Sequence, residues 1–409
     1  MARVVLVTGK GGVGKTTTAA STAVRAARSG LRTLVMSTDA AHSLGDALDV
    51  DLTTARTWRE TTEVEPGLHA LAVGAHTAVE ADWQVVRDYL LGVLDAMGVD
   101  AVVADELTSL PGAEEVTALA ALAHQADSGD WDLVVVDCAP TAETLRLLAL
   151  PEVLGWHLDR LLPAQRRLLT VLRPAASAAT GVPVPGPEVL LVLRAWRELM
   201  VGVRALLTST RASVRVVLTP ERVVIAESRR VLTSLSLHGY AVDAVVVNRL
   251  LPAAVAGDTD PWRAAWTTAQ ATGLEQVRES FLGIPLLCAP YLAGEPIGAD
   301  ALDALASATV ADAGGLPVPA LMDDVDVPRM TVAADGADFV LTLPLPLVSA
   351  GMVGMARRED DLLLEVGGQR RVVTLPSVLR RCIVRSAAVG GGSLRVRFER
   401  DEEQWASGR

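Results

Sequence analysis

The chain has 409 residues, half of them hydrophobic, and its 49 acidic residues outnumber 37 basic ones to give a net charge of −12. That balance argues against a nucleic-acid partner, because phosphate contacts need clustered cations. No uncharged apolar run approaches the roughly 18–20 residues that a membrane-spanning helix needs. The three cysteines, Cys138, Cys288 and Cys382, form no C-x-x-C pair. With a strand predicted almost at the N-terminus, we expect a cytoplasmic protein without a signal peptide.

The first predicted elements are a short buried strand over residues 3–8 and an alanine-rich helix over residues 16–28. The segment between them fits the phosphate-loop pattern G-x-x-x-x-G-K-[ST], in the strand–loop–helix context that the pattern requires. Both lysines of the chain, Lys10 and Lys15, lie in this loop, and every other basic residue is an arginine. A compact ammonium group fits a loop wrapped round phosphate better than a planar guanidinium group does.

This loop predicts binding of ATP and Mg²⁺. Its glycines let backbone N–H groups turn toward phosphate, and the helix N-terminus adds positive potential. Lys15 is expected to reach the β- and γ-phosphates, and Thr16 to offer its hydroxyl group to Mg²⁺. The predicted nucleotide-binding residues of the loop are Gly11, Gly12, Val13, Gly14, Lys15, Thr16 and Thr17.

Up to about residue 312, short apolar runs alternate with helical stretches. The strands predicted after the first are residues 33–37, 68–73, 133–136, 214–218, 244–247 and 285–287. Strands separated by helices predict an α/β fold with a doubly wound, mostly parallel sheet, whose ligands lie at the carboxyl ends of the strands.

Polar residues follow three of these strands. Asp137 comes directly after four apolar residues and is well placed to hold Mg²⁺ through water, although it could instead cap a helix. For Asp39 the residues alone leave a site carboxylate and a helix cap equally open. Asn248 has an amide free to contact a base edge, or it is a plain turn residue.

Residues 151–212 are predicted to form an apolar helical insert. Two interpretations stay open: amphipathic helices packed on the core, or an exposed apolar surface for a client. Leu161, Leu162, Leu168 and Leu169 are spaced to share one helix face.

The C-terminal part differs in character. Residues 313–328 are predicted to be a linker, residues 329–400 a small β-sandwich, and residues 401–409 an acidic tail. The predicted strands of the sandwich are residues 339–346, 361–366, 370–375, 382–386 and 393–398.

Lys10, at the second position of the phosphate loop, resembles the "deviant Walker A" signature of ATPases that work as nucleotide-gated dimers. Residues 37–44 resemble the first switch of the arsenite-pump and tail-anchored-protein-targeting branch (the ArsA/Get group), and residues 137–141 its second switch. The resemblance spans residues 1–312, and the C-terminal part resembles the α-crystallin (small heat-shock) sandwich of some bacterial members. Later positions in the expected order are Pro220-Glu221, Glu227, Val247-Asn248-Arg249 and Gly294-Glu295.

The resemblance implies a homodimeric Mg²⁺-ATPase that opens and closes an apolar client site within residues 151–212, with a transient membrane-protein partner in some settings. Lys10 would reach into the partner subunit's site, and Asp39 would orient the attacking water next to the metal. Asp137 would position Mg²⁺ through water, and Asn248 would contact adenine.

The chain departs from the family pattern at Ala40, Ala142 and Glu143, and it lacks the paired cysteines that hold zinc, so no zinc is expected. Two other functions stay open. One is the ATPase subunit of an arsenite or anion efflux pump, which needs soft thiolates. The other is a nucleotide-binding scaffold with little turnover.

Overall fold

The computed structural model describes residues 2–39, 43–53, 57, 59–73, 84–89, 91, 94–95, 113–139, 141, 144–152, 186–252, 260–327, 329–336 and 338–402. The predicted client face at Leu161, Leu162, Leu168 and Leu169 lies outside these residues, as do Ala40, Ala142 and Glu143. Within the described part of the chain, no helix combines the length and apolar character that crossing a membrane requires.

Nine strands of the described residues form one sheet in the order β3-β4-β2-β5-β1-β6-β7-β8-β9. All neighbouring pairs from β4 to β8 are parallel, and the edge strands β3 and β9 pair antiparallel. The strands are β1 Arg3–Thr8, β2 Thr33–Ser37, β3 Thr62–Glu65, β4 Leu68–Ala72, β5 Leu133–Asp137, β6 Ala212–Leu218, β7 Val242–Leu250, β8 Leu286–Pro290 and β9 Val310–Ala311.

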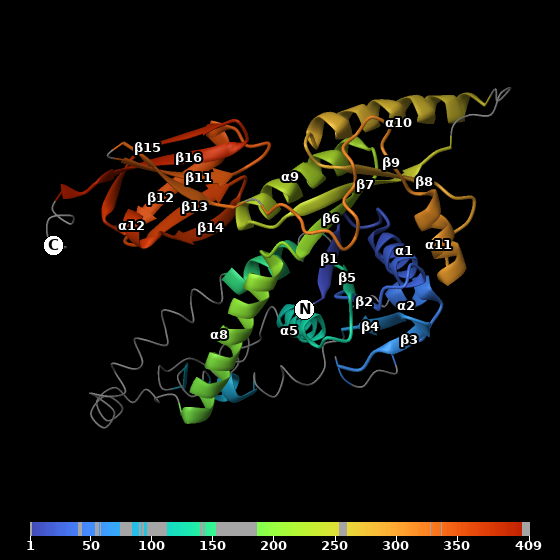
Figure 1. Ribbon diagram of the computed structural model, residues 1–409, viewed down its shortest axis with the longest axis horizontal. Coiled ribbons are helices and arrows are strands. Elements are labelled where there is room, and N and C mark those ends of the chain that lie inside the picture. Colours follow the sequence, from blue (N-terminus) through green and yellow to red (C-terminus); the bar gives the residue numbers. More distant parts are fainter. Residues whose placement is uncertain are drawn as a thin grey trace.

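Both faces of this sheet are buried, as alternation along β1 shows. Val4 and Leu6 belong to the core on one face, and Val5 and Val7 to the core on the other. Helices α1, α2 and α11 cover the second face, while α5, α8, α9 and α10 cover the first (Figure 1). The helices are α1 Lys15–Arg28, α2 Ser43–Leu48, α5 Ala113–Asp127, α8 Pro187–Leu207, α9 Arg222–His238, α10 Pro261–Ser280 and α11 Ala299–Ala308. The doubly wound α/β fold is therefore confirmed.

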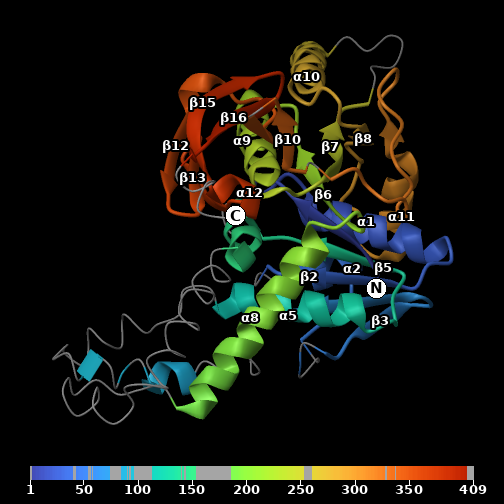
Figure 2. The same cartoon turned by 60° about the vertical axis from the view of Figure 1, so that its left-hand side comes forward.

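Helix α8, in the second half of the predicted insert, buries one stripe and exposes another. Val192, Trp196 and Met200 pack into the core, while Leu191 is 70% exposed and Val201 is 51% exposed. Figure 2 shows α8 running past α5 and projecting away from the sheet. For the buried stripe of α8, the core interpretation holds.

The C-terminal part is a sandwich of two antiparallel sheets, β10-β11-β16-β15 and β12-β13-β14. Leu341 and Phe398 from one sheet share a core with Leu362 and Leu364 from the other, as alternating inward residues do in a sandwich. The elements are β10 Thr331–Asp335, β11 Asp338–Pro344, a 3₁₀ turn Ala350–Met352, β12 Val353–Arg358, β13 Asp361–Val366, β14 Gln369–Thr374, α12 Ser377–Arg380, β15 Cys382–Gly390 and β16 Ser393–Arg400.

The strands predicted from the sequence are present in the structure, and the strands that were missed lie at the edges of the sheets. β3, β9, β10 and β12 had no predicted counterpart, because they are short, exposed or interrupted by charged residues and glycine.

Part of the segment predicted as a linker is buried against the rest of the chain. Val325 and Val327 are buried with Ala241, and the Val325 N–H donates to the Thr210 carbonyl at 2.9 Å.

Candidate functional site

The phosphate loop lies between β1 and α1, in the middle of the sheet, and two of its glycines are required by close approach. A Cβ atom on Gly9 would lie 2.1 Å from the Val217 carbonyl oxygen. On Gly14, whose φ is +93°, it would lie 2.3 Å from Nδ2 of Asn248. Only glycine fits such positions, so the loop is pressed against β6 and β7.

Helix α1 begins at Lys15 and offers a free N-terminus toward the loop. Gly14 at the N-cap provides no side-chain cap, and no acidic residue lies in the first turn. The first backbone N–H groups of a helix lack internal partners and carry positive potential, which makes this end an anion site. Lys15 is buried, with 8% of its surface exposed, so its charge stays close to the loop.

Asp137 is the last residue of β5 and lies beside Val7 of β1 and Ser37 of β2. It is fully buried, and Ser37 Oγ donates to its Oδ2 at 3.4 Å. Burial raises the pKa of Asp137 to about 6, against the lowering effects of the Thr16 hydroxyl and the Lys15 charge. Among the described residues its Oδ1 has no hydrogen-bond partner. An unpaired carboxylate oxygen is costly to bury, and hydrated Mg²⁺ is a ligand that fits it.

The first switch reaches the same edge of the sheet. Oγ1 of Thr16 lies 3.3 Å from Oγ of Ser43, the first residue of α2. The backbone N–H of Asp39 donates to Ser37 Oγ at 3.1 Å, and the Asp39 charge helps to raise the pKa of Asp137. The structure therefore brings Thr16, Asp39 and Asp137 together, with Ser37 and Ser43 as contacts that sequence reasoning did not single out.

Asn248 lies inside β7 rather than after it, and both sides of its amide already bond to backbone. Its Nδ2 donates to the Val13 carbonyl at 2.8 Å, and its Oδ1 accepts from the Arg249 N–H at 2.8 Å. Each side of the amide keeps one further hydrogen-bonding position, so a contact of Asn248 with adenine stays a prediction. Asn248 also ties β7 to the phosphate loop.

A hollow of ≈ 400 Å³ with mixed polar and apolar walls opens beside this tie and is lined by Gly14, Thr17, Asn248, Arg249 and residues 290–296. The loop that closes it is anchored at both ends, since Tyr291 N–H donates to the Leu250 carbonyl at 2.7 Å and Gly298 N–H to the Ala47 carbonyl at 2.9 Å. The sequence signal for this loop is its position at the carboxyl end of β8.

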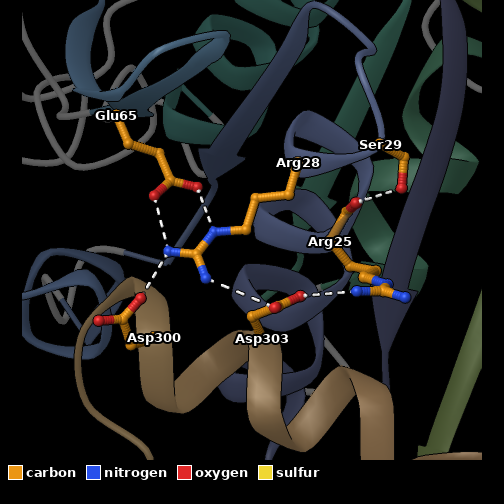
Figure 3. A network of polar contacts seen from close by, with 6 residues as sticks. All are labelled: Arg25, Arg28, Ser29, Glu65, Asp300 and Asp303. Carbon is orange, nitrogen blue, oxygen red and sulfur yellow. Dashed lines mark hydrogen bonds and ion pairs between the residues drawn. The ribbon is translucent and has the colours of Figure 1, made fainter.

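Helix α11, which follows that loop, is held against α1 by charge. Arg28 of α1 lies between Glu65, Asp300 and Asp303, and Arg25 also contacts Asp303 (Figure 3). These ion pairs are exposed and individually weak. Together with the packing of α11 against α1, they help to fix the position of the loop that lines the hollow.

Lys10 makes its ion pair outside this set of groups. Its Nζ lies 3.5 Å from Oε2 of Glu227 on α9, and the two side chains are 38% and 26% exposed. The two lysines of the loop therefore differ: Lys15 is buried at the helix N-terminus, and Lys10 is at the surface. The pairing of Lys10 with Glu227 was not foreseen.

Two family profiles match the chain. One, described as anion-transporting ATPase, matches residues 2–310, and the other, described as the HSP20-like domain found in ArsA, matches residues 336–398.

Similar proteins come from bacteria and plants. The Mycobacterium tuberculosis protein Rv2184c is 37% identical over 99% of this chain and 97% of its own length. A protein of Chlorobaculum tepidum named as a candidate arsenical pump-driving ATPase is 32% identical over 91% of this chain and 90% of its own length. ATPase GET3B of Arabidopsis thaliana is 34% identical over 60% of this chain and 63% of its own length. This chain belongs to the anion-transporting ATPase (ArsA) family and is an ATP hydrolase that carries an HSP20-like C-terminal domain.

Proposed function

We propose that the protein is a homodimeric, Mg²⁺-dependent ATPase of the cytoplasm, in which ATP binding and hydrolysis open and close an apolar client site within residues 151–212. The observation that carries this proposal is the separation of the two lysines. Lys15 completes a buried phosphate site within one chain, while Lys10 is exposed and paired with Glu227. In a dimer, Lys10 of one copy can reach the phosphate site of the other copy.

The roles of the site residues follow from their positions. The backbone of residues 11–17 binds the phosphates at the N-terminus of α1, and Lys15 neutralises their charge. Thr16 and Asp137 hold Mg²⁺, Asp137 through water, where the ion stabilises the negative charge of the phosphates. Asp39, beside them, orients the attacking water. Asn248 keeps the loop against β7, and adenine enters the adjacent hollow next to it.

The client site is supported by apolar surface on the insert. Leu191 and Val201 on α8 are exposed, and exposed apolar surface on a helix commonly marks a binding site. If the predicted leucine face joins this surface, Leu161→Asp with Leu168→Asp should keep the melting temperature and abolish client capture. If the double variant unfolds instead, the two leucines are part of the buried core.

The names of several relatives favour a second candidate, the ATPase of an arsenite efflux pump. The cysteines give it little support. Cys138 is buried in the sheet core and Cys382 in the sandwich core, whereas Cys288 of β8 lies 3.9 Å from Asp312. Burial raises the pKa of the Cys138 and Cys288 thiols, which disfavours thiolate. Among the described residues, no group of three His, Cys, Asp or Glu side chains could hold a metal ion.

The test of the dimer is complementation between two inactive variants. Lys10→Ala should keep ATP affinity and lose turnover, since groups supplied across an interface contribute on the order of 10³–10⁵ in rate. Asp39→Asn should also bind ATP without hydrolysing it. Mixed after dissociation, the two should recover about a quarter of wild-type turnover, because half of the randomly assorted dimers are mixed and each has one complete site.

The same mixture separates the alternatives. If Lys10 acts on the phosphate of its own chain, each mixed dimer contains two defective sites and no activity returns. Full activity of Lys10→Ala by itself would remove Lys10 from catalysis altogether.

A further inference from the structure

A short helical stretch leads from the nucleotide site toward the C-terminal sandwich. It covers residues 144–152 and follows Asp137 and the second switch along the chain. At its start, the Thr144 hydroxyl donates to the Ala139 carbonyl at 2.5 Å. At 1.5 Å per residue the stretch is roughly 12 Å long, and Glu152 lies at the far end of its described part. Because a helix moves as a rigid element, a displacement at Glu152 reaches the second switch.

The core of the ATPase part holds the middle of this stretch. Leu147 and Leu148 are buried in the same core as Cys138 of the second switch. The Tyr240 hydroxyl donates to the Leu148 carbonyl. The stretch therefore packs on the sheet, and its contact with the sandwich is made through the carboxylate of Glu152.

Glu152 pairs with cations from both parts of the protein. Arg204 of α8 and His238 of α9 belong to the ATPase part, and Arg371 of β14 belongs to the sandwich. The side chains of Glu152 and Arg371 are 11% and 8% exposed, so water and salt screen this pair little. A buried carboxylate that loses one of its cations is destabilised in its place. A change at Arg371 therefore acts on the far end of the stretch.

The sandwich is itself held firmly enough to serve as a fixed point. Helix α9 contacts β11, β13 and β14 (Figure 1), and Leu237 of α9 is fully buried in the sandwich core. In the other direction, Leu347 from the loop after β11 packs against the core of the ATPase part, although its φ of +65° is unfavourable for leucine. The Thr233 hydroxyl donates to the Pro346 carbonyl of the same loop at 3.5 Å.

We propose that the sandwich is a positioning domain for ATP hydrolysis, which holds the second switch in place through Arg371, Glu152 and the helical stretch of residues 144–152. Arg371 and Glu152 are then positioning residues, since neither belongs to the nucleotide site. The inference rests on the role proposed for Asp137 at the metal, and it adds that the C-terminal domain sets the rate of the chemical step.

The test separates turnover from nucleotide binding in the full-length protein. Arg371→Met should lower kcat about tenfold, within the range of changes along such chains of contacts. It should leave KM for ATP unchanged, because the phosphate loop is intact. Arg370→Met, at the exposed neighbour, should keep the wild-type kcat. Val396→Ala weakens the sandwich core at a side chain that is 1% exposed and far from the ion pair in sequence, and it should also keep the wild-type kcat. All variants are assayed at a temperature where circular dichroism shows them folded.

A double-mutant cycle on kcat tests the route. Glu152→Gln removes the charge through which Arg371 acts, so Arg371→Met should have no further effect on kcat in that background. Effects of the two substitutions that multiply would show that Arg371 does not act through Glu152, and would overturn the inference.

The remaining outcomes separate this inference from the proposed function. A wild-type kcat in Arg371→Met, or an equal loss in Val396→Ala, overturns the positioning role of the ion pair. Asp137→Asn is the reference for the site itself. If it is inactive while Arg371→Met is fully active, the proposed site stands and the inference alone fails. If Asp137→Asn hydrolyses ATP like wild type, the proposed metal site fails, and the inference fails with it.

Discussion

Arg371 of the C-terminal sandwich and Glu152 of the ATPase part form a buried ion pair, with Arg371 Nε 3.1 Å from Glu152 Oε1. Glu152 lies in the helical stretch of residues 144–152, which follows the second switch. It also pairs with Arg204 of α8 and His238 of α9, each at 3.1 Å. Arg371 donates in addition to the Leu237 carbonyl, and Leu237 is part of the sandwich core.

The HSP20-like domain therefore packs against the ATPase part and is not joined to it by the linker alone. One carboxylate joins the helical stretch after the second switch, α8 of the insert and the C-terminal end of α9. The first half of α9 carries Glu227, the partner of Lys10. A movement of α9 during the ATPase cycle would reach the sandwich directly.

Arg371→Met should destabilise this docking by about 2 kcal/mol, because it removes one partner from a carboxylate that stays buried with two others. The neighbouring Arg370 is the matched control. Its side chain is 83% exposed and pairs with an exposed Glu365, so Arg370→Met should change the free energy of unfolding by less than about 0.5 kcal/mol. Chemical denaturation measures both. Equal effects of the two substitutions would show that the Arg371–Glu152 ion pair does not stabilise the contact between the sandwich and the ATPase part.

The same carboxylate predicts a pH dependence. Although burial acts to raise it, the pKa of Glu152 is lowered from 4.5 to about 2 by His238, Arg371 and Arg204. A carboxyl group whose pKa is lower in the folded state stabilises that state above the unfolded value and loses this contribution as the pH falls.

We therefore expect wild type to be more stable than Glu152→Gln near neutral pH, and this difference to shrink as the pH falls from 4.5 toward 2. Paired denaturation series at pH 7, 5 and 3.5 would measure it. A difference that stays constant with pH would contradict the assigned ion pairs.

Asp39→Asn should leave Mg²⁺-ATP binding intact and stop hydrolysis, because an amide cannot accept the proton that an attacking water loses. Asp46→Asn serves as the control, since Asp46 is exposed on α2. Equilibrium titration with ATP and a single-turnover assay separate binding from chemistry. Loss of ATP binding in Asp39→Asn would make Asp39 a structural or metal-holding residue instead.

Gly14→Ala should weaken nucleotide binding by at least about tenfold, because the added Cβ would displace Asn248 from the phosphate loop. Gly129→Ala has the same backbone demand, a φ of +84°, but its Cβ would meet nothing within 4 Å. The control should therefore lose about 1 kcal/mol of stability and keep its affinity for ATP. Titration with a fluorescent ATP analogue compares the two. Equal affinities would mean that the tie between Asn248 and the loop is dispensable.

Arsenite should neither bind with micromolar affinity nor stimulate ATP hydrolysis, because a soft metalloid needs several thiolates together and Cys138 and Cys382 are buried in separate cores. Calorimetry and a steady-state ATPase assay with arsenite test this. Stimulation that disappears in Cys288→Ser or Cys382→Ser would place the efflux-pump function first.

The sequence by itself determined the local features of this protein. The phosphate loop, the strands with their alternating burial, Asp137 at the end of β5 and most strands of the sandwich follow from patterns within a few residues. Such patterns carry information because backbone geometry repeats every two residues in a strand and every 3.6 in a helix.

Only the tertiary structure decided which distant side chains meet. Lys10 with Glu227, Asn248 with the Val13 carbonyl and Glu152 with Arg371 join segments more than 200 residues apart. Strand order in the large sheet sets the first two contacts, because β1 lies between β5 and β6, and β7 follows β6. The packing of the sandwich against the end of α9 sets the third. Periodicity reports which side of an element is buried, and it carries no record of the element that covers it.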